Sequence, residues 1–129
     1  MLVARQPTPV LFVAGEDELG AIRAAWERLE AVVPLRGRRF FGVFDPGAWY
    51  RACVERLPDE EAGELEAGVI PGGPYLRERL RGEPPGIYTE LAAAFERLEA
   101  LAQRDPSRPG IEHYRRRDEI DVLMPVHAE

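Results

Sequence analysis

The residues best placed for chemistry lie in one strand-like segment near the end of the chain. Because side chains alternate along a strand, Glu112 and Tyr114 share one face while Ile111 and His113 share the other. A carboxylate among aromatic rings can attract a cation through Coulomb and cation–π interactions. The pattern therefore indicates a candidate cation site, although the same spacing is also typical of a carboxylate on a solvated sheet face.

The neighbouring strand is expected to add two residues to this candidate site. If Ile111 packs beneath helices, Glu112 and Tyr114 point to the opposite, concave side of the sheet. The aromatic-rich segment that pairs with this strand then contributes Gly42 and Phe44. The phase of both strands predicts a ligand-binding surface on the face that carries no helix.

Trp49 is a further candidate contact for an aromatic ligand. It follows the turn at residues 45–47, and if Tyr50 faces inward, alternation sends Trp49 to the ligand side. A tryptophan at the rim, packed on the adjacent loop, is the alternative.

Other catalytic or metal-binding patterns are missing from the sequence. There is no glycine-rich phosphate loop, no cysteine pair and no serine nucleophile elbow. The two histidines, His113 and His127, have a spacing that indicates no metal site, and Cys53 is the single cysteine. We therefore expect neither a metal nor a cofactor.

Composition narrows the class of partner. The chain has 129 residues and 45% hydrophobic content, which suits one domain with one packed core. Its net charge of −6 repels a phosphate backbone, and the arginine run 115–117 fits a solvated hairpin loop, so no direct binding of nucleic acid is expected. No apolar stretch is long enough to cross a membrane, and a cytoplasmic protein is expected.

The chain carries an internal repeat. Residues 24–31 return as residues 93–100, shifted by 93 minus 24, or 69 residues, with only Trp26 replaced by Phe95. Extending the comparison gives one domain over residues 1–129, with repeat one at 1–57 and repeat two at 64–126.

Each repeat reads as strand, strand, helix, strand, strand. Apolar residues recur at helical spacing over residues 19–33 and 87–103, which predicts two amphipathic helices. Strands are predicted at 2–5, 10–14, 40–44, 49–55, 65–70, 75–81, 111–114 and 119–126. The expected fold is α+β: two pseudo-twofold-related repeats forming one curved antiparallel sheet, with both helices on one face and a ligand cavity on the other.

The order of several short motifs resembles a known family. Segments 70–75 (IPGGPY), 81–82 (RG), 109–114 (PGIEHY) and 121–126 (DVLMPV) look like the GyrI-like small-molecule-binding domain. This domain is the effector-binding module of multidrug-responsive transcription regulators of the MerR and AraC classes. The resemblance covers essentially the full chain, including the duplication.

The resemblance implies a pocket between the two repeats for bulky, often cationic and aromatic compounds. A glutamate serves as the electrostatic anchor, which corresponds to Glu112, with Tyr114 beside it. The sequence departs from the family at residues 83–86 (EPPG), where Tyr88 takes the place of the usual aromatic residue. No DNA-binding domain fits before Val10, so we expect a stand-alone sensing or sequestering module.

Two alternatives to simple binding follow from the same resemblance. Some stand-alone relatives are similar to hydrolases of reactive cyclopropane-bearing compounds, which use a glutamate and an aromatic hydroxyl. Here Glu112 with Tyr114 or Tyr88 could activate a water molecule. The other alternative is a protein partner such as gyrase or a separate DNA-binding regulator.

Overall fold

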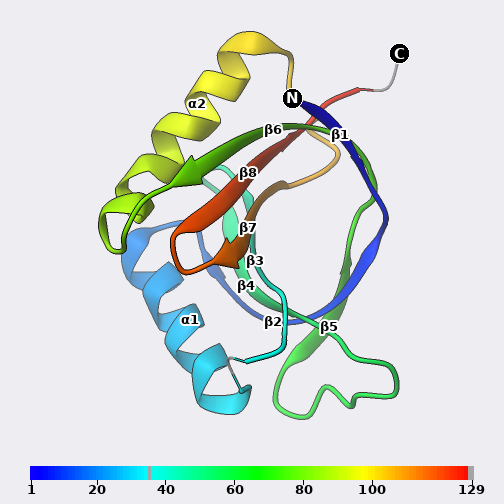
Figure 1. Cartoon of the computed structure of the whole chain (residues 1–129). Coiled ribbons are helices and arrows are strands. Elements are labelled where there is room, and N and C mark those ends of the chain that lie inside the picture. The colour runs from blue at the N-terminus through cyan, green and yellow to red at the C-terminus, as the bar shows by residue number, and fades with distance from the viewer. Residues whose placement is uncertain (35, 128–129) are drawn as a thin grey trace.

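A computed structural model describes residues 1–34 and 36–127, which form an α+β structure with one curled antiparallel sheet of eight strands and two helices (Figure 1). The sheet bends into a half-barrel, and the two helices lie outside the curl. The elements are β1 (Leu2–Arg5), β2 (Thr8–Glu16), α1 (Leu19–Val32), β3 (Phe40–Asp45), β4 (Trp49–Glu55), β5 (Glu66–Ile70), β6 (Gly73–Arg81), the 3-10 helix η1 (Gly86–Glu90), α2 (Leu91–Leu101), β7 (Gly110–Arg116) and β8 (Glu119–Pro125).

The helix ends follow local chemistry. The Glu18 carboxylate caps α1 by accepting a hydrogen bond from the backbone N–H of Ala21, and Pro34 follows the last turn. The second helix predicted from the sequence is two elements, since the 3-10 helix η1 follows Pro84 and Pro85, begins at Gly86 and precedes α2. Within the described residues, no helix is long and apolar enough to cross a membrane.

The strand order is β1-β6-β8-β7-β3-β4-β2-β5. If β1 is exchanged with β5, β2 with β6, β3 with β7 and β4 with β8, the result is the same order read from the opposite edge of the sheet. The central pair is β3 with β7, in which Gly42 lies directly opposite Glu112. At the edges the halves are interleaved, because β1 pairs with β6 and β5 pairs with β2.

Both faces of the sheet are packed. The outer cluster joins α1 and α2 to the sheet through Ala25, Leu29, Ala94, Phe95, Leu98, Leu11, Tyr50, Ala52, Val54, Val122 and Met124, among others. The inner cluster fills the curl and contains Val10, Phe12, Phe41, Val43, Cys53, Ile70, Tyr75, Ile111 and Leu123, with no helical residue. Burial of both clusters stabilises the curl at about 25 cal/mol per Å² of apolar surface.

The prediction that Ile111 packs beneath the helices is wrong. Ile111 is fully buried in the inner cluster with Phe41, on the face without helices. Alternation then turns Glu112 and Tyr114 to the helix-bearing face. The sequence argument assumed that only one face of the sheet is apolar, whereas the curl gives the second face an apolar core of its own.

Candidate functional site

Glu112 lies at the centre of a hydrogen-bonded group on the helix-bearing face. Its Oε1 accepts hydrogen bonds from the hydroxyl of Tyr50 at 2.8 Å and from the hydroxyl of Tyr114 at 2.7 Å. The indole Nε1 of Trp26 donates to the Tyr50 oxygen at 3.0 Å. Residues from α1, β4 and β7 therefore meet at one carboxylate.

Gly42 makes room for this group. It pairs with Glu112 on β7 and with Ala52 on β4, and the side chains of Tyr50 and Glu112 meet over it. A Cβ at Gly42 would collide with the Tyr50 hydroxyl and the Glu112 carboxylate, and would lie 2.9 Å from Tyr50 Cζ. A Cβ atom essentially never lies within 3.0 Å of such a neighbour, so the group needs glycine at this position.

Aromatic rings border the carboxylate. The rings of Trp26 and Tyr114 meet edge to face with centroids 5.2 Å apart, and the ring of Tyr88, on η1, lies 6.5 Å from Tyr114. Trp26 and Tyr114 are half-buried, while Tyr88 is 48% exposed. The aromatic group thus has one edge open to solvent, between α1 and η1.

The electrostatics of the group are those of a carboxylate without a cation. Burial raises the pKa of Glu112, and hydrogen bonds from Tyr114 and Tyr50 oppose that shift only in part. Part of the Glu112 side chain remains accessible to solvent. The protein atoms around it nevertheless exclude enough water to raise the pKa of its carboxyl group. Among the described residues, no arginine, histidine or N-terminus forms an ion pair with it.

The two phenols act as hydrogen-bond donors at neutral pH. Burial raises the pKa of Tyr50 and of Tyr114 well above the ordinary tyrosine value, and the nearby charge of Glu112 raises both further. Both hydroxyls therefore keep their protons and direct them at the carboxylate.

The structure brings some of the predicted site residues together and separates others. Tyr114, Gly42 and Glu112 meet, and Tyr88 joins them through its contact with Tyr114. Phe44 shares their face, but its ring packs against Phe95 of α2 at 5.0 Å.

Trp49 does not reach this group. It packs on the inner cluster, on the opposite face of the sheet from Glu112. The guanidinium carbon of Arg51 lies 4.7 Å from the centroid of Trp49 and 4.5 Å from that of Phe12. The alternation that separates Trp49 from Tyr50 is as predicted, but Glu112 is on the side of Tyr50.

Sequence reasoning missed two members of the group, Tyr50 and Trp26. Tyr50 belongs to the outer cluster, and Trp26 is packed against it. The available signal was Gly42, since a glycine between two strands leaves space that a long side chain from a neighbouring strand can fill.

Two of the cavities in the described part of the chain stand out, and Glu112 lines neither of them. One, of about 340 Å³, is lined by Arg5, Gln6, Pro7, Thr8, Pro9 and Arg39. The other, of about 150 Å³, is lined by Val10, Phe12, Val43, Trp49, Arg51, Cys53, Val69, Ile70, Pro71 and Pro109. We place the candidate site at Glu112 because the hydrogen-bonded carboxylate and the aromatic rings beside it lie there. In the part of the chain that the structure describes, no group of three or more acidic, histidine or cysteine side chains could hold a metal ion.

Several solved structures share this fold. An integron cassette protein from the mobile metagenome of Vibrio cholerae aligns with a TM-score of 0.77 at 15% identity, covering 98% of this chain and 95% of its own. SAV2435, solved bound to tetraphenylphosphonium, aligns with a TM-score of 0.69 at 13% identity, covering 99% and 93%. A hydrolase from Listeria innocua aligns with a TM-score of 0.55 at 12% identity, covering 98% and 90%.

At these identities the likeness concerns the fold alone. No protein-family profile matches the chain. No curated protein matches it either.

Proposed function

We propose that this chain binds bulky aromatic cations at Glu112, between α1 and η1. The observation that carries the proposal is a largely desolvated carboxylate with hydrogen bonds from two phenols, a border of aromatic rings and no cationic partner among the described residues. Burying such a charge is costly, and a bound cation would offset that cost. SAV2435, which shares the fold, was solved with the aromatic cation tetraphenylphosphonium.

The order of elements supports a tandem repeat in which the site lies near the pseudo-twofold axis. Two strands, a helix and two strands occur twice in the chain, and the central pair of the sheet joins β3 to β7. Gly42 and Glu112, related by 112 minus 42, or 70 residues, face each other there. This agrees with the resemblance to the GyrI-like domain, and a stand-alone sensing or sequestering role is part of the proposal.

Binding of tetraphenylphosphonium should weaken as the pH falls through the raised pKa of Glu112. The cation carries no titratable proton, and only the ionised carboxylate attracts it. Below that pKa the affinity should fall by up to about tenfold per pH unit, until it levels off at the affinity of the protein with a neutral side chain at this position. Protonation has the opposite effect on the free protein, because a raised pKa in the folded state stabilises the fold at low pH and that stability is lost as pH rises. Calorimetric titrations over this range measure the first effect.

The control for this pH series is Glu112→Gln, whose binding should show little pH dependence. A variant profile that falls as steeply as that of the wild type would assign the titration to another group, for example His113.

Ligand binding should change the fluorescence of Trp26 and leave Trp49 unaffected. Trp26 contacts Tyr114 and donates a hydrogen bond to Tyr50, whereas Trp49 lies on the other face of the sheet. Titrating the Trp49→Phe variant with tetraphenylphosphonium should therefore give the full change in emission. The Trp26→Phe variant should give almost none, and the reverse result would place the ligand on the inner face.

A hydrolase is the second candidate, favoured by one specific feature. Glu112 with a raised pKa touches two phenolic hydroxyls, an arrangement that could take a proton from water and polarise a substrate. One structure with the same fold is a hydrolase. Turnover of a reactive cyclopropane-bearing compound, lost in Glu112→Gln while binding persists, would support this candidate over simple binding.

A further inference from the structure

Two guanidinium groups lie near the Phe41 ring on the inner face, which is the face of the sheet opposite Glu112. The guanidinium carbon of Arg5, at the end of β1, lies 5.2 Å from the centroid of the Phe41 ring, and that of Arg39 lies 5.8 Å from it. Arg5 and Arg39 also line the cavity of about 340 Å³ where the chain passes from β1 to β2. Like charges so close together attract an anion between them.

One N–H group of Arg5 makes no hydrogen bond. Its Nη2 donates to Thr8 Oγ1 at 3.2 Å, but its Nε is buried and has no hydrogen-bond partner. Among the described residues no carboxylate forms an ion pair with Arg5. A buried N–H without an acceptor is costly, so a ligand that supplies one gains affinity.

Only some of the N–H groups of Arg39 are hydrogen-bonded within the protein. Its Nε donates to Glu55 Oε2 at 2.9 Å, and its Nη2 bonds the same oxygen. These contacts leave the Nη1 group of Arg39 for a ligand, and the side chain is 54% exposed. Glu55 neutralises part of this charge, which leaves Arg5 as the main source of positive potential in the cavity.

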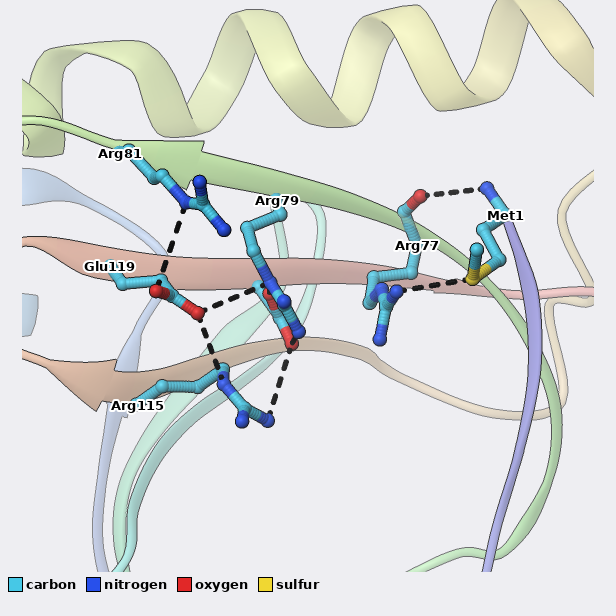
Figure 2. A network of polar contacts seen from close by, with 7 residues as sticks. Met1, Arg77, Arg79, Arg81, Arg115 and Glu119 are labelled. Atoms are coloured by element: carbon cyan, nitrogen blue, oxygen red, sulfur yellow. Dashed lines mark hydrogen bonds and ion pairs between the residues drawn. The ribbon is translucent and has the colours of Figure 1, made fainter.

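The nearest buried acid cannot serve as the counter-ion of Arg5. Asp121 is bound by Arg79, with Nε 2.7 Å from Oδ1, and approached by Arg115 at 3.7 Å. Figure 2 shows Arg79 and Arg115 also converging on Glu119, at 3.2 and 3.3 Å. The acids in this network are therefore already shared among several arginines.

We propose that the cavity between Arg5 and Arg39 is a binding site for a small oxyanion, the phosphate or carboxylate group of a small molecule. Arginine suits either group because its planar fork makes paired, charge-assisted hydrogen bonds. Thr8 and Gln6 add polar surface beside the fork. The net charge of −6 opposes a polyanion, so the site favours a single compact group.

His113 provides a reporter for this site. Its ring stacks on Phe41 with centroids 4.6 Å apart, beside both guanidinium groups. Burial is the largest of the causes that lower the pKa of His113 to about 4. Arg5, Arg115 and Arg39 contribute to this lowering, and Asp121 opposes it. An anion bound between Arg5 and Arg39 would offset their effect and raise this pKa.

The test is an NMR titration of the full chain with inorganic phosphate and, separately, with acetate, at constant ionic strength in chloride. We expect saturable shifts of the Arg5, Thr8 and His113 signals at millimolar concentrations or below, and an upward shift of the His113 pKa. Stronger binding of phosphate would identify a phosphoryl ligand, and stronger binding of acetate a carboxylate. Arg5→Gln should weaken binding at least about tenfold.

Arg77→Gln is the matched control, since Arg77 lies on the same face of the sheet but contacts Met1 instead of the cavity (Figure 2). It removes the same charge and should keep most of the affinity. If Arg5→Gln does not fold, Arg39→Gln serves in its place. Equal weakening by Arg77→Gln, or no saturable shift in the wild type, would overturn the site. Tetraphenylphosphonium binding should be unchanged in Arg5→Gln, so this test is independent of the proposed cation site.

Discussion

Replacing Glu112 with Gln should weaken the binding of tetraphenylphosphonium about 5- to 150-fold, which corresponds to roughly 1 to 3 kcal/mol. The substitution keeps the shape of the side chain and removes the charge. At an effective dielectric constant near 20, a pair of charges about 5 Å apart gains on the order of 3 kcal/mol before desolvation is subtracted. Calorimetric titration of both proteins at neutral pH measures the difference.

The matched control for this substitution is Glu83→Gln. Glu83 is exposed and pairs with Arg117 at the surface. Its substitution therefore removes the same formal charge without changing the aromatic group around Glu112. A neutral ligand of the same shape should bind Glu112→Gln as well as the wild type, or slightly better, because an unpaired buried carboxylate is costly. Unchanged affinity for the cation in Glu112→Gln would refute the proposed site.

Replacing Gly42 with Ala should lower the free energy of unfolding by about 1 to 3 kcal/mol and weaken cation binding with it. The new methyl group would occupy the space of the Tyr50 hydroxyl and the Glu112 carboxylate. Tyr50 is 2% exposed and cannot swing away, so its hydrogen bond with Glu112 has to break. Chemical denaturation measures the first effect and calorimetry the second.

Two further variants test this explanation. Gly86→Ala adds the same methyl group where nothing lies within 4 Å, and it should be almost neutral. Adding Tyr50→Phe to Gly42→Ala removes the atom that suffers the worst collision, so the double variant should recover part of the lost stability. If Gly42→Ala costs no more than Gly86→Ala, the crowding around Glu112 has no energetic consequence.

The order and type of the elements could be predicted because each leaves a local signal. The strands Leu2–Arg5 and Trp49–Glu55 have the predicted bounds, and α1 ends one residue before the predicted end. The 3-10 turn of η1 could not be predicted, since the apolar spacing of residues 87–103 fits a continuous helix. Its start is set by the preceding prolines and by packing of Ile87, which is buried.

The face on which Glu112 lies was predicted wrongly, although its strand neighbours were right. Period-2 alternation fixes which side chains share a face, but it does not say which face the helices cover. One sequence cue was available. The runs Val10-Leu11-Phe12 and Val122-Leu123-Met124 are apolar without alternation, which is typical of strands buried on both faces.

The hydrogen bond between Tyr50 and Glu112 could not be derived from spacing along the chain. The two residues are 62 positions apart, and they meet only because β3 lies between their strands and carries Gly42 at that point. Strand pairing across the two halves of the chain sets this geometry, and no local pattern encodes it.

The interleaved edges of the sheet determine when the chain can fold. The strand β1 finds its partner only in β6, where Leu2 pairs with Leu76, 74 residues later. During synthesis β1 therefore emerges before its partner strand. It can pair only after β6 has left the ribosome. Such long-range pairing slows folding and leaves an open strand edge in the nascent chain. Because β1 pairs with β6 and β2 pairs with β5, the sheet can be completed only after residues 73–81 have been made.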